Sequence, residues 1–199
     1  MNETLEQARA LLENARRIVA VTGAGISAES GVPTFRGPEG LWKSHRPEEL
    51  ATAEAFARDP QTVWEWYGWR RKLIATCSPN PAHLALARLA LDHPEVAIIT
   101  QNVDGLHTRA AKEEAGHVDF SPALPIELHG SINRDRCSAC DARRPGSPVI
   151  DVTSIDTLPQ CDRCSALMRP DVVWFGEVLK DKYIRLIKKR GMFIGETII

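Results

Sequence analysis

Four cysteines in two C-x-x-C pairs constrain the fold of this chain more than any other feature of its sequence. Cys137 and Cys140 form the first pair, and Cys161 and Cys164 form the second after twenty intervening residues. Each C-x-x-C turn places two thiolates on one side of a tetrahedron, so two such turns can close a four-cysteine zinc site. Because a closed site leaves no position for water, the sequence predicts one structural Zn2+ in a small zinc-ribbon insert. A redox dithiol is the alternative interpretation of either pair.

Short apolar runs alternate with segments of helical periodicity along most of the chain. Two of these runs, Ile18–Val21 and Val96–Thr100, have the composition of buried strands. Helices are expected in the segments 5–15, 51–74 and 83–91. This order is typical of an α/β domain with a parallel sheet. After the cysteines, Val172–Phe175 predicts a further strand.

The composition excludes several classes of protein. Hydrophobic residues make up 43% of the 199 residues, which is enough for a core, and 25 basic residues nearly balance 26 acidic ones. This balance gives no sign of bulk electrostatic binding to nucleic acid or to an anionic membrane. No apolar stretch is long enough to span a bilayer, and paired cysteines suit a reducing compartment. We therefore expect a cytoplasmic protein with neither a nucleic-acid nor a membrane partner.

A glycine-rich turn directly follows the first apolar run. Gly23, Ala24, Gly25 and Ser27 belong to a G-x-G-x-x-A pattern. In such a turn, glycines let the backbone approach a pyrophosphate, and amides at the start of a helix bind it. Alone, the pattern is equally consistent with a tight turn that binds nothing. No second strand ending in an acidic residue follows about twenty residues later, which disfavours a hydride-transferring dehydrogenase.

Six motifs in a fixed order resemble the sirtuin family. They are Gly23–Ser27, Gly31–Arg36, Thr100–Asp104, Leu128–Gly130, the two cysteine pairs, and Phe175–Glu177. The resemblance covers about residues 15 to 179 and implies a Rossmann-like parallel sheet with a zinc module. It also implies NAD-dependent removal of acyl groups from lysine side chains of proteins or peptides. NAD is then a co-substrate, and nicotinamide and O-acyl-ADP-ribose are the products.

The resemblance implies a cofactor role for ten positions. The turn containing Gly23, Ala24, Gly25 and Ser27 would hold the pyrophosphate, and Phe35 and Arg36 would belong to a loop that closes over the cofactor. The ribose and nicotinamide pocket would be formed by Gln101, Asn102, Val103 and Asp104. Turn chemistry after a strand explains Asn102 and Asp104 about as well when each is taken alone.

The resemblance also implies catalytic and substrate-binding positions. His129 would be the general base that activates a ribose hydroxyl, because an imidazole titrates near working pH, and Asn102 would be the second catalytic residue. Val173, Phe175 and Gly176 would bind the substrate peptide by strand pairing. A hydrogen-bonded structural histidine and an ordinary internal strand are the alternative interpretations.

Two residues three positions apart indicate which acyl group is removed. Tyr67 and Arg70 can point into the same pocket from one helix. The Y-x-x-R pattern resembles the sirtuin subgroup that removes succinyl, malonyl and glutaryl groups. A guanidinium can bind a terminal carboxylate bidentately while the phenol adds one hydrogen bond. The alternative is a surface helix on which an arginine lies beside an aromatic residue.

The expected organisation has three parts. Residues 1–133 form the first part of the NAD-binding domain, with a helical insert at about 45–75, and residues 134–170 form the zinc module. Residues 171–199 return to the first domain and end in a basic tail, so we expect the Rossmann-like sheet to be incomplete at the C-terminus. The alternative function is a catalytically impaired remnant that acts as a zinc-stabilised binding module.

Overall fold

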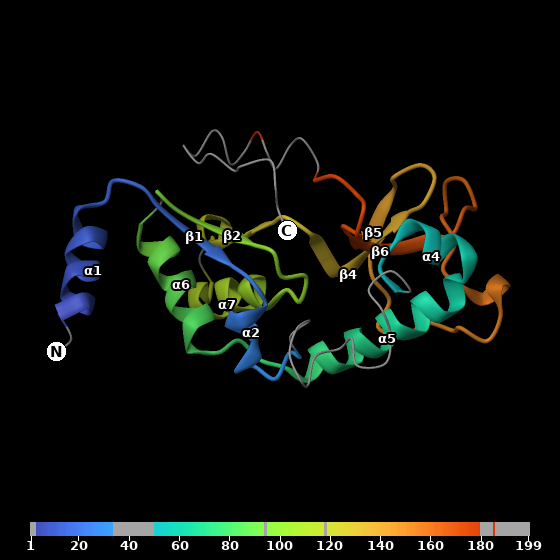
Figure 1. The fold of residues 1–199 in the computed structure, drawn as a ribbon, viewed down its shortest axis with the longest axis horizontal. Helices are drawn as coiled ribbons and strands as arrows, with labels where there is room; N and C mark the ends of the chain where they lie inside the picture. Colours follow the sequence, from blue (N-terminus) through green and yellow to red (C-terminus); the bar gives the residue numbers. More distant parts are fainter. Residues whose placement is uncertain (1–2, 34–49, 94, 118, 180–184, 186–199) are drawn as a thin grey trace.

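The computed structural model describes residues 3–33, 50–93, 95–117, 119–179 and 185. Its first sheet is parallel and has the order β1 (Ile18–Thr22), β2 (Val96–Thr100), β3 (Ile126–Glu127). Its second sheet is antiparallel, with β4 (Gly130–Cys137) between β5 (Arg143–Pro145) and β6 (Met168–Val172). Figure 1 shows the parallel sheet in the left half of an elongated molecule and the antiparallel sheet in the right half. The expected α/β fold with a parallel sheet and a small cysteine-bearing module is confirmed.

Two helices cover the parallel sheet. Helices α6 (Pro81–Asp92) and α7 (Leu106–Ala115) pack against each other, and alanines on both share a buried cluster with Val96 and Ile98 of β2. Every residue of β2 is buried, because strands of the sheet flank it on both sides. Asn80 begins α6 by accepting hydrogen bonds from the amides of Ala82 and His83, and Pro81 presets the first turn.

The second core lies under the antiparallel sheet. Helices α4 (Ala53–Arg58) and α5 (Pro60–Thr76) line this sheet, as Figure 1 shows. The large side chains of Trp64, Tyr67, Ile132, Met168 and Trp174 are almost fully buried in one cluster there. The helix expected over 51–74 is divided in two, because Asp59 precedes Pro60 and leaves the helical conformation at φ −148°. The Asp59 carboxylate then caps α5 by accepting from the Thr62 amide.

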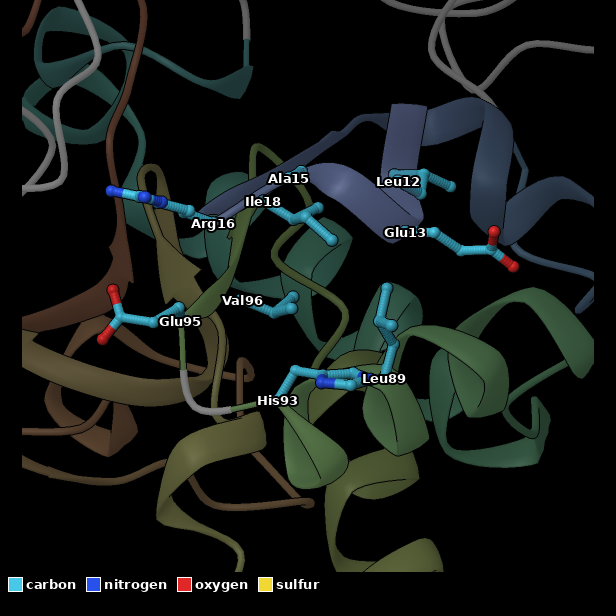
Figure 2. A pocket seen from close by; sticks show the side chains of 9 residues that line it. All are labelled: Leu12, Glu13, Ala15, Arg16, Ile18, Leu89, His93, Glu95 and Val96. Carbon is cyan, nitrogen blue, oxygen red and sulfur yellow. The ribbon is translucent and has the colours of Figure 1, made fainter. Parts of the chain in front are cut away.

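The N-terminal helix contributes no buried residue. Helix α1 (Glu3–Asn14) has the expected amphipathic pattern, yet Leu5, Leu11 and Leu12 are all at least half exposed. Leu12 lines a groove of about 470 Å3 together with Ile18, Leu89 and Val96, which face one another in Figure 2. Strand β1 beside it is only partly covered, and Val21 is 54% exposed, because β1 lies at the edge of the described sheet.

The prediction of a strand at Val172–Phe175 is wrong. The strand observed is β6, which ends at Val172 and belongs to the antiparallel sheet. Beyond it, the amides of Val173 and Phe175 donate to the carbonyls of His129 and Ala51 instead of forming a ladder. Strand β4 runs through the expected domain boundary at 133/134 without a break. Among the described residues, no helix has both the length and the apolar character needed to cross a membrane.

The 3-10 helices and the short helix α2 complete the description. Helix η2 (Ser121–Ala123) precedes β3, and η3 (Ile155–Thr157) lies between the two cysteine pairs. Helix α2 (Ala24–Ala28) starts one residue after the end of β1, with Gly23 between the two elements. The parallel sheet therefore presents a strand-to-helix turn next to the end of β2.

Candidate functional site

The carboxyl ends of β1 and β2 meet at one edge of the parallel sheet. Gly23 follows β1 in an extended conformation and caps α2 without any side chain. Among the described residues, no heavy atom would contact a Cβ added to Gly23 or Gly25 within 4 Å. The backbone of this turn is therefore open to a ligand. Gln101 follows β2, and its amide donates to the carbonyl of Thr22 at 3.0 Å, which ties the two strand ends together.

A polar network joins the two strand ends to the turn. The Asn102 side-chain amide donates to the carbonyl of Gly23 and to Ser27 Oγ, each at 3.0 Å. Ser27 Oγ donates to Asp104 Oδ2 at 2.8 Å, and Asp104 Oδ1 accepts from the amide of Leu106. Ser27 and Asp104 are buried. The structure thus brings Gly23, Ser27, Asn102 and Asp104 together, and their roles in binding a cofactor stay predictions.

Two buried histidines in this network are absent from the sequence-based prediction. His83 Nδ1 accepts from the amide of Asn80, so its Nε2 carries the proton and lies 3.4 Å from Ser27 Oγ. His107 Nε2 lies 2.9 Å from Thr22 Oγ1, and the two imidazole centroids are 4.7 Å apart. Burial and the neighbouring His83 lower the pKa of His107 to about 4. Position alone offers one signal, since His107 lies three residues beyond Asp104.

His129 lies immediately before β4 and faces the end of β2. Its Nδ1 is 3.0 Å from the carbonyl oxygen of Gln101. A carbonyl only accepts, so Nδ1 carries the proton and Nε2 of the neutral ring is left with its lone pair. Burial lowers the pKa of His129 below its ordinary value, and the hydrogen bond to Gln101 opposes this shift. The imidazole is therefore neutral near pH 7 and can accept a proton at Nε2.

Tyr67 and Arg70 are both buried on α5. Tyr67 is 1% exposed and Arg70 is 4% exposed, and the Arg70 guanidinium lies 4.7 Å from the centroid of the Trp66 ring. Burial lowers the pKa of Arg70, with the Tyr67 phenol and Asp104 opposing the shift. The Tyr67 hydroxyl accepts from Trp174 Nε1 at 2.8 Å. A surface helix with a solvated arginine, the alternative interpretation, does not describe this pair.

The other predicted positions are placed less centrally. Val103 is buried, and its carbonyl accepts from the amide of Ile132. Val173 is half-buried, whereas Phe175 is 56% exposed and Gly176 has a φ of +82°. Phe175 and Gly176 are therefore exposed residues next to the buried Trp174. Phe35 and Arg36 lie outside the described residues.

The four cysteines form a candidate metal centre. Their sulfur atoms all lie within 4.8 Å of one another. Cys137 Sγ is 3.5 Å from Cys164 Sγ, and Cys140 Sγ is 3.6 Å from Cys161 Sγ. A tetrahedron with Zn–S bonds of about 2.3 Å has S–S edges of roughly 3.8 Å, so this set fits zinc.

The two cysteine turns have the same local structure. In each turn the amide of the first cysteine donates to a carbonyl just beyond the second, Ala142 for Cys137 and Ala166 for Cys161. The amides of Cys140 and Ala139 point at Cys137 Sγ and lower the pKa of that thiol to about 6. At Cys137, the thiolate that a metal requires is thus favoured by the turn itself.

The fold and these contacts define an α/β protein in which a dinucleotide-type turn and a neutral histidine share one sheet edge, next to a four-cysteine metal module. The sequence model of the Sir2 family matches residues 23–194. The chain therefore belongs to the Sir2 family, the sirtuins, as its motifs predict.

Named relatives agree with this assignment. NAD-dependent protein deacylase 2 of Pyrobaculum aerophilum is 52% identical over 85% of this chain and 62% of its own length. The NAD-dependent protein deacylase of Thermococcus kodakarensis is 51% identical over 88% of this chain and 65% of its own length. A solved mutant of a Sir2 homologue in complex with ADP-ribose matches with a TM-score of 0.78 and 42% identity, covering 96% of this chain and 70% of that one. The chain thus spans a little under two thirds of the length of these two curated relatives.

Proposed function

We propose that this chain is an NAD-dependent protein-lysine deacylase. The observation that carries the proposal is the meeting of the open Gly23–Ser27 turn, the Asn102 amide and a neutral His129 at one sheet edge. The relatives that are 52% and 51% identical to this chain are both named NAD-dependent protein deacylases, which further supports the proposal. The proposed substrates are acyl-lysine side chains of proteins or peptides.

The residues of the turn are suited to holding NAD. Gly23 and Gly25 leave the backbone uncovered, so the pyrophosphate can approach the amides that follow β1. Gln101, Asn102 and Asp104 lie at the end of β2, where the ribose and nicotinamide would be held. When bound, NAD supplies a ribose carbon that takes up the acyl oxygen as nicotinamide leaves. In this arrangement the Asn102 side chain holds the turn next to the pocket through its hydrogen bonds to Gly23 and Ser27.

His129 is the proposed general base. The Gln101 carbonyl holds the imidazole in the tautomer that leaves Nε2 unprotonated. Because burial lowers its pKa, the ring remains neutral at pH 7 and is ready to take a proton from a ribose hydroxyl. The proposed zinc ion plays no part in this step, since four thiolates close its coordination shell and fix the fold of the module.

The finer proposal is a preference for acidic acyl groups such as succinyl and malonyl, with acetyl as a poorer substrate. Phe175 and Gly176 would align the peptide, so that the acyl-lysine reaches past Trp174 toward Tyr67 and Arg70. Buried arginines bind carboxylates strongly because water is excluded. An acidic acyl group would bring its own counter-charge to Arg70, whereas an acetyl group would bring none.

Arg70→Met is the matching test. With paired succinyl-lysine and acetyl-lysine peptides, kcat/KM for desuccinylation should fall by about a hundredfold or more, while deacetylation changes little. Losing a charge-assisted hydrogen bond to a buried partner corresponds to about 3 kcal/mol, which is the source of this factor. Lys72→Met, an exposed change on the same helix, is the control. Equal losses on both peptides would refute the assignment of Arg70.

The alternative of a non-catalytic zinc-stabilised module is not favoured by the comparisons. A cytoplasmic location remains part of the proposal, and it rests on the paired cysteines, which suit a reducing compartment.

A further inference from the structure

His107 is a buried histidine at the carboxyl ends of β1 and β2 that takes no part in the proposed chemistry. Its side chain belongs to the first turn of α7, and only 3% of the residue is exposed. Asp104 Oδ1 accepts from the amide of Leu106 and so begins α7 a few residues after the end of β2. This start turns His107 back toward the sheet, where its Nε2 lies 2.9 Å from Thr22 Oγ1.

Two threonine hydroxyls extend the contact of His107 across the sheet. Thr22 and Thr100 are register partners and are the last residues of β1 and β2. Thr22 Oγ1 donates to Thr100 Oγ1 at 2.9 Å, and Thr100 Oγ1 accepts from the amide of Asn102 at 3.1 Å. The chain of hydrogen bonds therefore runs from α7 through both strand ends to Asn102.

The tautomer of His107 follows from the direction of this chain. Thr22 has one hydroxyl hydrogen and donates it to Thr100, so Nε2 of His107 is the donor to Thr22. Nδ1 of the ring then has a lone pair and no proton. Among the described residues, this atom is buried and has no hydrogen-bond partner. The opposite tautomer would bury an N–H group at Nδ1 without an acceptor, which costs more free energy than an unpaired lone pair.

The surroundings of His107 also keep its ring neutral. The ring of His83 lies 4.7 Å away between centroids. Burial first, and then the neighbouring His83, lower the pKa of His107 to about 4. A neutral ring with its proton on Nε2 donates one hydrogen bond, and the acceptor of that bond is Thr22.

Thr100 connects this chain to both halves of the proposed site. Its carbonyl accepts from the amide of Leu128, the residue before His129, at 2.9 Å. Its hydroxyl holds the amide of Asn102, whose side chain donates to the carbonyl of Gly23. A displaced Thr100 hydroxyl would therefore shift Asn102 relative to the glycine turn.

We propose that His107 is a positioning residue of the deacylase site. Its Nε2–H group orders the hydroxyls of Thr22 and Thr100 and thereby fixes the backbone of Asn102 in the proposed ribose pocket. This inference rests on the proposed function for the identity of the bound cofactor. Because two threonines separate it from Asn102, His107 acts only through them.

Hydrogen exchange at the Asn102 amide, followed by NMR on the isotope-labelled, zinc-loaded chain, tests this role. The amide nitrogen of a glutamine can take the place of imidazole Nε2, whereas an asparagine is too short to reach Thr22. His107→Asn should speed exchange at Asn102 about tenfold, as expected for the loss of one buried hydrogen bond, and His107→Gln should leave it nearly unchanged. Thr22→Val removes the next hydroxyl, keeps the shape of the side chain and should act like His107→Asn.

Two comparisons make the test specific. Glu113→Gln, an exposed change on α7, is the control and should leave exchange at Asn102 unchanged. The buried amide of Ile98 in β2 reports on the stability of the sheet and should keep its exchange rate. Unchanged exchange at Asn102 in either His107→Asn or Thr22→Val would overturn the positioning role. Equal acceleration at Ile98, or in His107→Gln as much as in His107→Asn, would also overturn it, since a general loosening of the fold explains either result.

Steady-state kinetics separate this inference from the proposed function. In His107→Asn, kcat/KM for NAD should fall about tenfold or more at a saturating acyl-lysine peptide, because a shifted Asn102 distorts the cofactor pocket. KM for the peptide should change by less than about twofold. Turnover without a selective loss toward NAD contradicts only the positioning role. Selective exchange at Asn102 in a chain without any turnover supports the positioning role and contradicts the deacylase activity.

Discussion

The buried ion pair between Arg71 and Asp135 predicts a large loss of stability when either partner is removed. Arg71 lies on α5 and Asp135 on β4, and their side chains are 5% and 1% exposed with Nη2 and Oδ1 2.5 Å apart. Arg71 Nε also donates to the carbonyl of Ile132 at 2.6 Å, and Nη1 donates to that of Ser147 at 3.0 Å. One guanidinium thus joins the helix of the proposed acyl pocket to the strand that follows His129 and to the cysteine-bearing module.

Arg71→Met should destabilise the protein by about 3–5 kcal/mol, the range expected when one partner of a buried ion pair is removed. The variant leaves Asp135 buried without the Arg71 cation and removes one donor from each of three carbonyls, those of Ile132, Arg134 and Ser147. At a urea slope of about 2 kcal/mol/M, this loss corresponds to a midpoint roughly 2 M lower. Asp135→Leu combined with Arg71→Met should recover part of the loss, because no uncompensated charge then remains.

The loss of stability in Arg71→Met should depend on pH. Burial already raises the pKa of Asp135 above its ordinary value, with the Arg71 charge opposing the shift. Without Arg71 the pKa of Asp135 in the folded protein rises further above its value in the unfolded chain. The Arg71→Met variant is therefore most stable at low pH, where Asp135 is protonated, and loses stability as the pH rises through this raised pKa. The difference between wild type and Arg71→Met should therefore narrow from pH 7 to pH 5 in urea titrations. A pH-independent difference below about 1 kcal/mol would refute this account of the contact.

Two further predictions concern the metal and the buried histidines. Removing zinc with a strong chelator should unfold the region from β4 to β6, because structural zinc sites contribute on the order of 10 kcal/mol to folding. Near-UV circular dichroism should show the loss of structure, and added zinc should reverse it. An unchanged spectrum after verified metal loss would contradict the structural role. The pKa of His107 is lowered to about 4 in the folded protein, whereas in the unfolded chain this histidine takes up a proton near pH 6.5. The free energy of unfolding should therefore fall by up to about 3 kcal/mol as the pH is lowered from about 6.5 to about 4. His107→Asn should flatten this acid limb, and an unchanged slope would show that the titrating groups lie elsewhere.

The local features of this fold can be predicted from sequence. The cysteine turns follow from spacing alone, since the amide donors to Cys137 Sγ and Cys161 Sγ come from residues two or three positions away. The strands at Ile18–Thr22 and Val96–Thr100 follow from uninterrupted apolar runs bounded by Thr-Gly and Thr-Gln. The Asn102 and Asp104 positions follow from the family motifs and not from their composition.

Features that depend on distant contacts could not be predicted in this way. Strand β6 contains Arg169 and Asp171, which are buried because Glu177 and two arginines of the neighbouring strands pair with them. No local pattern reveals that pairing, so the apolar residues just after β6 predict a strand where none forms. Likewise, His83 reaches Ser27 over 56 positions, and Arg71 reaches Asp135 over 64. Both residues look like ordinary helix positions in the sequence.

Nicotinamide release by the purified, zinc-loaded chain tests the central proposal most directly. NAD is incubated with a succinyl-lysine peptide and, in parallel, with an acetyl-lysine peptide, and His129→Ala is the matched variant. The account predicts peptide-dependent release that favours the succinyl peptide, with formation of deacylated lysine abolished in His129→Ala. Folded, zinc-loaded protein that releases no nicotinamide with either peptide would contradict the proposal that this chain is a working deacylase.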